Sequence, residues 1–274
     1  MNGLTANFGM YDGGELTAAN DVLWSAIAAR ITDVDGVPTQ LDRTVGPPGV
    51  WLDDRLLLGQ ACGYPFAKRL AERLVLAGTP DYTAPGCEPG AHRSFIVVAA
   101  RTRTRSLRQL RGVCAAVNDT ESMTGRHLLG EALAPAPGAI TSTVVSGSHA
   151  RSLALVASGG ADVAAIDCIT YAHLARLSPE MVAETRTIAW TRTVPALPFV
   201  TARSLGAKTA ARVASALRSV MIDPELADVR RVLRLRGLTT RGPSDYAALL
   251  PIAARADSVF LLDQSAKSTP SQFA

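Results

Sequence analysis

Hydroxyl, glycine and imidazole side chains gather at two places where a predicted strand leads into a predicted helix. The first place follows the strand over 112–117 and holds Ser122, Met123, Thr124 and Gly125. The second follows the strand over 140–145 and ends at His149. A helix start exposes unpaired backbone N–H groups at the positive end of the helix dipole. Each place therefore predicts a site for a small oxyanion, and the alternative is ordinary helix capping by residues such as Ser122.

Four further roles complete the candidate site. His149 can donate a hydrogen bond to an oxyanion, or it can be a structural histidine. Asp167 directly follows the predicted strand over 161–166, where it can bind an ammonium or hydroxyl group of a ligand or cap the next helix. Tyr11 follows the opening strand, and Tyr64 lies in the segment GQACGYPF after the strand over 56–58. Both tyrosines can face a cleft from its other side, although a Gly-Tyr-Pro turn with a packed tyrosine is the commoner use of such a tripeptide.

No assembled catalytic apparatus is visible. The chain has no GxGxxG, Walker A, HExxH or GxSxG motif and no Cys/His spacing typical of a metal site. Ser148 and His149 are sequence neighbours, which disfavours a nucleophile–base contact between them. The sequence therefore predicts no catalytic residue, no metal and no cofactor.

Composition excludes several classes of protein. The chain has 274 residues, 47% of them hydrophobic, with 28 Lys and Arg against 24 Asp and Glu. No window of about 18 residues lacks charges and helix breakers, so no membrane span is predicted. Arginines cluster at 101–111 and 230–236, which could indicate nucleic-acid binding or a solvated face. Aromatic residues do not interleave with them, which favours the solvated face and predicts no nucleic-acid partner.

The sequence leaves the cellular compartment open. The segment MNGLTANFGMYDGGE shows no secretory signal, so we expect either a cytoplasmic protein or one whose leader precedes this numbering. Cys114 and Cys168 lie in or beside predicted buried strands, where cysteine usually packs as a small hydrophobe. Cys62 and Cys87 lie in predicted loops, and a disulfide between them is conceivable in an oxidising compartment.

Strands and helices alternate along most of the chain, which predicts a parallel α/β architecture. Helices are expected over 14–31, 64–73, 122–133, 148–158, 167–175, 206–221, 225–233 and from Ser244 with a kink at Pro251, and a loop over 79–92. Extended crossings near 93–101 and 186–196 bracket a compact central segment. The expected organisation is a discontinuous first lobe, 1–95 with 195–274, and a second lobe, 96–194, that close on a ligand.

Four segments then resemble a known family. LGQACGYPF, VNDTESMTGRHLL, VSGSHARSLALVASGGADVAAIDCITYAHL and TVPALPFVTA are similar, in order and spacing, to the phosphate/phosphonate substrate-binding proteins of ABC transporters. The resemblance covers nearly the whole chain. It implies the type II periplasmic binding fold, with two lobes, a two-strand hinge and an oxyanion in the cleft. It places the oxyanion on Ser122, Met123, Thr124, Gly125 and His149, with Asp167, Tyr64 and Tyr11 beside it.

The expected function is therefore a solute-binding protein that captures a phosphonate, a phosphate or a related ester. The resemblance implies an ABC permease as partner and a periplasmic location. Two alternatives use the same fold: a cytoplasmic enzyme acting on a small carboxylate, with His149 or Asp167 as acid or base, and a ligand sensor without transport.

Overall fold

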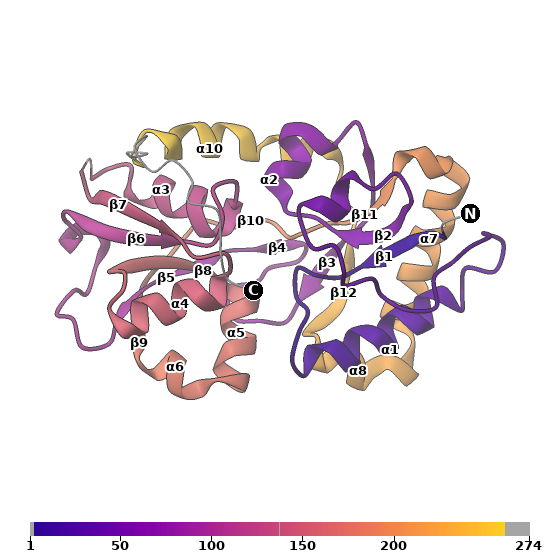
Figure 1. Cartoon of the computed structure of the whole chain (residues 1–274), viewed down its shortest axis with the longest axis horizontal. Coiled ribbons are helices and arrows are strands. Elements are labelled where there is room, and N and C mark those ends of the chain that lie inside the picture. The colour runs from indigo at the N-terminus through magenta and orange to yellow at the C-terminus, as the bar shows by residue number, and fades with distance from the viewer. Residues whose placement is uncertain (1–2, 137, 261–274) are drawn as a thin grey trace.

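The computed structural model describes residues 3–136 and 138–260, which form two five-stranded sheets side by side (Figure 1). The first sheet has the order β1 (Thr5–Asn7), β2 (Leu56–Gln60), β11 (Phe199–Ala202), β3 (Leu74–Tyr82) and β12 (Leu235–Thr239). The second has the order β7 (Ile140–Val145), β6 (Val113–Val117), β8 (Val163–Asp167), β5 (Ser94–Ala99) and β9 (Thr185–Trp190). The chain contributes to the first sheet both before and after it builds the second.

Both sheets are mixed, so the predicted parallel architecture holds for only part of each sheet. β1 and β2 are parallel, as are β6, β7 and β8, whereas β11, β12, β5 and β9 run antiparallel to their neighbours. The antiparallel strands pair with strands that are distant in sequence, and the local alternation of elements does not show such pairing. The parallel strands still end at a common edge in each sheet, and the candidate residues follow these ends.

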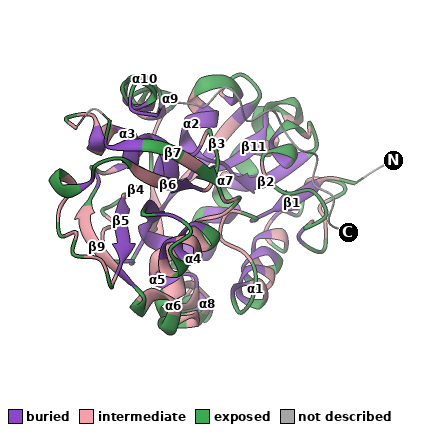
Figure 2. Ribbon diagram, turned by 60° about the vertical axis from the view of Figure 1, so that its left-hand side comes forward, coloured by how far each residue is buried: buried purple, intermediate pink, exposed green. Residues whose placement is uncertain are grey.

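Helices cover the sheets and bury one face each. α1 (Leu16–Ala28), α7 (Gly206–Ile222) and α8 (Ala227–Val232) lie by the first sheet, and α3 (Leu128–Leu133), α4 (His149–Ser158), α5 (Cys168–Leu177) and α6 (Pro179–Ala183) by the second. α7 buries Val213, Leu217 and Val220 at helical spacing, as the sequence predicts. Figure 2 shows β1, β2, β5 and β11 buried and the outer helix faces exposed, whereas β7 at the edge of the second sheet is largely exposed. The remaining short helices are η1 (Gly49–Leu52), α2 (Gly63–Pro65), η2 (Phe66–Leu70), η3 (Leu107–Gln109), η4 (Met123–His127), η5 (Arg203–Leu205) and η6 (Pro224–Leu226).

A two-stranded ladder lies between the sheets. β4 (Ala91–His92) pairs antiparallel with β10 (Val194–Pro195), in the two segments where the chain passes from one sheet to the other (Figure 1). The predicted loop over 79–92 is partly wrong, because β3 continues to Tyr82 and pairs with β12. Pro80 and Asp81 are typical of turns, but Asp81 is satisfied here by the hydroxyl of Thr239, 2.7 Å from its Oδ1.

The last helices connect the two sheets. α9 (Pro243–Ala247) and α10 (Leu249–Asp257) are separated at Ala248, three residues before the proline that the sequence marked as the kink. α10 packs on α3 beside the second sheet, and Gly130 of α3 lies against Ala256 and Phe260. This segment belongs to the part of the chain, 195–274, that the sequence assigned to the first lobe, and residues 261–274 of it lie outside the described residues. None of the helices in the described ranges combines the length and apolar character of a membrane span.

Candidate functional site

The junction after β6 forms a wide helical turn that presents backbone amides. Ser122 is the N-cap of η4, and its Oγ accepts a hydrogen bond of 3.0 Å from the Gly125 amide. The amides of Arg126 and His127 both donate to the Ser122 carbonyl at 3.1 Å. The capping role weighed for Ser122 is thus present. The first amides of the turn, those of Met123 and Thr124, precede this pattern and have no carbonyl one turn back to pair with.

Gly125 allows the close approach of two other residues. A Cβ atom at this position would overlap Oδ1 of Asn118, lie 2.8 Å from its Cγ and lie 3.1 Å from Cε1 of His149. Asn118 directly follows β6, and its buried Oδ1 has no hydrogen-bond partner within the described residues. The absence of a side chain at 125 therefore lets the loop pack tightly against Asn118 and His149.

His149 joins the second junction to the first. It begins α4, and its Nε2 lies 3.0 Å from Oγ1 of Thr124, a hydrogen bond whose donor depends on the ring tautomer. Its Nδ1 lies 3.5 Å from the amide nitrogen of Asp167. Burial lowers the pKa of His149, and the nearby Asp167 carboxylate opposes this effect. The side chains that follow β6, β7 and β8 therefore meet at one edge of the second sheet.

Both oxygens of Asp167 lie against other groups of the protein. Its Oδ1 accepts hydrogen bonds of 2.9 Å from the amides of Ile169 and Thr170, and so it caps α5. Its Oδ2 lies 2.7 Å from Nδ1 of His92 in a contact where both side chains are 2% exposed, and neither of these atoms makes a hydrogen bond among the described residues. Burial by itself would raise the pKa of Asp167, but His92 outweighs it, so the pKa is lowered. The capping role weighed for Asp167 is present, and its second oxygen faces His92.

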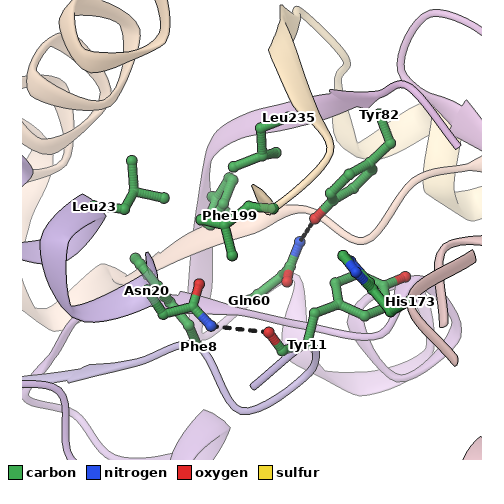
Figure 3. A pocket seen from close by; sticks show the side chains of 10 residues that line it. Phe8, Tyr11, Asn20, Leu23, Gln60, Tyr82, His173, Phe199 and Leu235 are labelled. Atoms are coloured by element: carbon green, nitrogen blue, oxygen red, sulfur yellow. Dashed lines mark hydrogen bonds between the residues drawn. The ribbon is translucent and has the colours of Figure 1, made fainter. Parts of the chain in front are cut away.

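Tyr11 approaches this edge from the first sheet. It lies edge-on to Tyr82 at 5.6 Å between ring centroids, and burial raises the pKa of its hydroxyl, followed by the charge of Asp167. The two tyrosines line a small cavity with Gln60 and His173 (Figure 3). The cavity measures about 20 Å³, room for one water-sized group. Both the Tyr11 hydroxyl and Nδ1 of His173 are buried there without a hydrogen-bond partner among the described residues.

Tyr64, in α2, packs on the helical turn η4 that follows β6. Its ring packs on His127 of η4 at 4.3 Å between centroids, with Nζ of Lys68 5.3 Å above it. Lys68 and Arg69 both pair with Glu121, at 3.2 and 2.5 Å, so ion pairs join η2 to the loop after β6. Tyr64 is buried and contacts η4, and no contact joins it directly to Asp167 or Tyr11 among those the structure describes.

The structure thus brings Ser122, Thr124, Gly125, His149 and Asp167 together, with Met123 buried in the same turn and Tyr11 nearby. Two residues were missed by sequence reasoning. Asn118 follows a predicted strand end, the rule that identified Ser122, and could have been found by it. His92 precedes a predicted crossing strand, and only the pairing of that segment with Asp167 shows its place.

The four cysteines lie apart from any candidate metal site among the described residues. Sγ of Cys87 lies 3.5 Å from that of Cys168, not beside Cys62, and all four thiols are free. Cys62 is buried at the start of α2, in the apolar cluster that contains Met123. Across the described residues, no group of three or more His, Cys, Asp or Glu side chains is arranged to hold a metal ion.

Acid is expected to destabilise the fold through its buried histidines. Burial, and then neighbouring arginines, lower the pKa values of His127 and His173 to about 4. The unfolded chain takes up these protons near pH 6.5. Stability therefore falls as pH falls from 7 to 5, by about 1–2 kcal/mol for each of the two histidines. Urea unfolding at both pH values measures this loss. His173→Gln should reduce this loss of stability by about 1–2 kcal/mol. An unfolding midpoint of the parent that is the same at pH 7 and pH 5 would contradict the lowered pKa values.

Comparisons with known proteins concern the family and the fold of the chain. A family model described as the periplasmic phosphonate substrate-binding protein of ABC transporters matches residues 60–246. No curated protein sequence matches the chain. PhnD1 from Prochlorococcus marinus, solved with methylphosphonate, is similar with a TM-score of 0.74 and 13% identity, over 94% of this chain and 99% of that one.

Two other solved structures share the fold. A binding protein component of a phosphonate ABC transporter from Pseudomonas aeruginosa has a TM-score of 0.73 and 15% identity, over 94% of this chain and 88% of that one. A histidine kinase sensor domain with similarity to periplasmic binding proteins has a TM-score of 0.58 and 15% identity, over 86% and 97%. At such identities these likenesses show the fold.

Proposed function

The chain belongs to the family of periplasmic phosphonate substrate-binding proteins of ABC transporters, and we propose that it holds a small phosphonate at the joined ends of β6, β7 and β8. The resemblance noted in the sequence and the α/β fold class are thereby confirmed. The observation that carries the proposed site is the contact between Thr124 and His149, because it brings two helix starts to one point. The presence of methylphosphonate in the P. marinus relative supports a phosphonate as the ligand class.

The proposed contacts suit a phosphonate group. The amides of Met123 and Thr124, the hydroxyls of Ser122 and Thr124 and the ring of His149 supply five hydrogen-bond donors. Hydrogen bonds to a charged group contribute about 1.5–3 kcal/mol each, so five give roughly 8–15 kcal/mol before the costs of association are subtracted. Micromolar affinity needs about 8 kcal/mol, so donors from a single junction are too few. Both helix starts have to take part.

The position of Asp167 indicates which substituent the ligand carries. One of its oxygens caps the start of α5, and the other lies 2.7 Å from Nδ1 of His92. An aminoalkyl group would have to compete with His92 for the carboxylate. An uncharged substituent such as methyl makes no such demand, and Tyr11 supplies an aromatic surface beside it. The proposed ligand is therefore a phosphonate with a compact uncharged substituent.

Capture is proposed to involve closure of two lobes, 1–95 with 195–274 and 96–194, about the β4–β10 ladder. Tyr11 and Tyr64 would then belong to the first lobe and the oxyanion donors to the second. The pairs of Lys68 and Arg69 with Glu121 join the two sides and favour the closed form. The proposed partner is an ABC permease, and the proposed location is the periplasm, with no turnover of the ligand.

A thermal-shift panel tests the proposed function. It compares methylphosphonate, aminoethylphosphonate, phosphate, phosphite, sulfate and a set of small aromatic carboxylates. A ligand at about 1,000 times its Kd adds about 4 kcal/mol, which is roughly 8–16 °C for a chain of this size. We expect the largest shift with methylphosphonate. A shift with the carboxylates alone would overturn the proposal in favour of an enzyme or a sensor for such compounds.

His149→Ala is expected to weaken methylphosphonate binding about 10- to 150-fold, because it removes one hydrogen bond to a charged group. Isothermal titration calorimetry measures the change. Ser158→Ala, at the far end of the same helix, is the control and should bind as the parent does. Equal affinities for His149→Ala and the parent would remove His149 from the site.

A further inference from the structure

Two cysteines outside the proposed ligand contacts lie side by side. Sγ of Cys87 is 3.5 Å from Sγ of Cys168, although 81 positions separate them in the chain. This is the one sulfur–sulfur contact within hydrogen-bond distance in the described part of the chain. A disulfide needs the sulfurs at about 2.05 Å. Since Cys87 lies in a loop, a small side-chain movement covers the difference.

Two hydrogen bonds and a tight turn close to the two thiols hold them side by side. The Cys168 amide donates to the Arg93 carbonyl at 3.0 Å, and Nε of Arg93 donates to the Gly86 carbonyl at 3.1 Å. Gly86 has a φ of +92°, and a Cβ atom there would lie 3.3 Å from Cβ of Cys168. A glycine at 86 thus permits both the left-handed turn and the close approach of the loop to α5. The juxtaposition therefore depends on one backbone hydrogen bond, on the Arg93 side chain and on the turn at Gly86.

The two cysteines also flank the buried ion pair at the site. Cys168 follows Asp167 at the start of α5, and Cys87 precedes His92 in the segment that crosses between the sheets. A covalent link would therefore close a ring around the His92–Asp167 contact. It would fix the crossing segment to the second sheet at the position where that segment meets the candidate site.

We propose that Cys87 and Cys168 form a reversible disulfide that fastens the crossing segment, residues 83–93, to the start of α5. The two thiols lose two protons and two electrons, and the oxidant is a disulfide of a small thiol or of an oxidoreductase, which is reduced to two thiols. This modification does not depend on the identity of the ligand.

The order of the two steps follows from exposure. Cys87 is partly exposed, whereas Cys168 is fully buried. The Cys87 thiolate therefore attacks the oxidant first and releases one thiol, which leaves a mixed disulfide on Cys87. Cys168 then attacks Sγ of Cys87 and releases the second thiol. The contact with Cys87 and burial raise the pKa of the Cys168 thiol, so the second step is expected to be the slower one.

The experiment uses the full chain, reduced and then treated with oxidised glutathione. We expect intact mass spectrometry to show a loss of about 2 Da, peptide mapping to assign it to Cys87–Cys168, and Tm to rise by about 4–16 °C, reversibly with a reductant. Cys87→Ser and Cys168→Ser should each abolish the rise, and the control Cys62→Ser should keep it. Hydrogen exchange should slow over residues 84–93 in the oxidised form.

Three results would overturn the proposal. The first is no mass loss under oxidation, or a stable glutathione adduct in its place. The second is a mapped bond that involves Cys62 or Cys114. The third is a Tm rise that survives in Cys87→Ser. A failure of phosphonate binding would leave all of these readouts intact, so the two proposals can be tested apart.

Discussion

Gly125→Ala is expected to reduce methylphosphonate affinity by at least about 100-fold. The new Cβ would overlap Oδ1 of Asn118 and lie 3.1 Å from Cε1 of His149. Asn118 would have to rotate, and the turn would move away from His149, which breaks the alignment of the two helix starts. Losing two hydrogen bonds to a charged ligand costs about 3–6 kcal/mol. Calorimetric titration of the variant and the parent measures the loss.

Two variants make this result specific. Gly46→Ala is the matched control, because position 46 has open space and no left-handed backbone, and it should bind as the parent does. The double variant Gly125→Ala with Asn118→Ala removes the overlapping group and should recover part of the affinity. Parent-like binding by Gly125→Ala alone would show that the ligand does not depend on this turn.

Asp167→Ala is expected to lower the free energy of unfolding by about 3–5 kcal/mol at pH 7, or roughly 6–20 °C in Tm. The substitution leaves His92 buried without its partner and removes the acceptor for two amides at the start of α5. The lowered pKa of Asp167 means that the parent keeps this stability above about pH 4 and loses it as pH falls further. Urea unfolding measures the difference.

Two further carboxylate variants separate the contributions to that loss. Asp228→Asn removes an exposed ion pair, in which the Asp228 side chain is 88% exposed, and should change stability by less than about 0.5 kcal/mol. Asp167→Asn keeps an acceptor for the cap and should lose less than Asp167→Ala. A loss below about 1 kcal/mol in Asp167→Ala would show that neither the ion pair nor the cap stabilises the fold.

Local sequence patterns predict most helices and strands, and also the strand-to-helix junctions proposed to bind the oxyanion. The apolar spacing in α7 and the strand-to-helix junctions at Ser122, His149 and Asp167 depend on neighbours in sequence, and the structure has them as predicted. The strand at Pro80 and Asp81 was missed because its partner, β12, lies in a distant part of the chain. Its turn-forming residues describe local preference, which the pairing overrides.

The parts of the site that sequence could not give depend on contacts between remote segments. Asp167 was expected either to meet a ligand or to cap a helix, and only the position of His92 shows that its second oxygen is engaged. Tyr64 is predicted by its position after a strand, but its packing on His127 follows from the way α2 meets η4. A disulfide between Cys62 and Cys87 is conceivable from the sequence because both lie in predicted loops, whereas in the structure the turn at Gly86 places Cys87 beside Cys168.

A crystal structure of the protein grown with methylphosphonate would locate the bound ligand. We expect phosphonate oxygens within hydrogen-bond distance of the Ser122–Gly125 turn and of Nε2 of His149, with the methyl group toward Tyr11. We also expect His92 still to contact Asp167. Phosphonate bound elsewhere, such as in the cavity between Tyr82 and His173 without contact to Thr124 or His149, would contradict the proposed site.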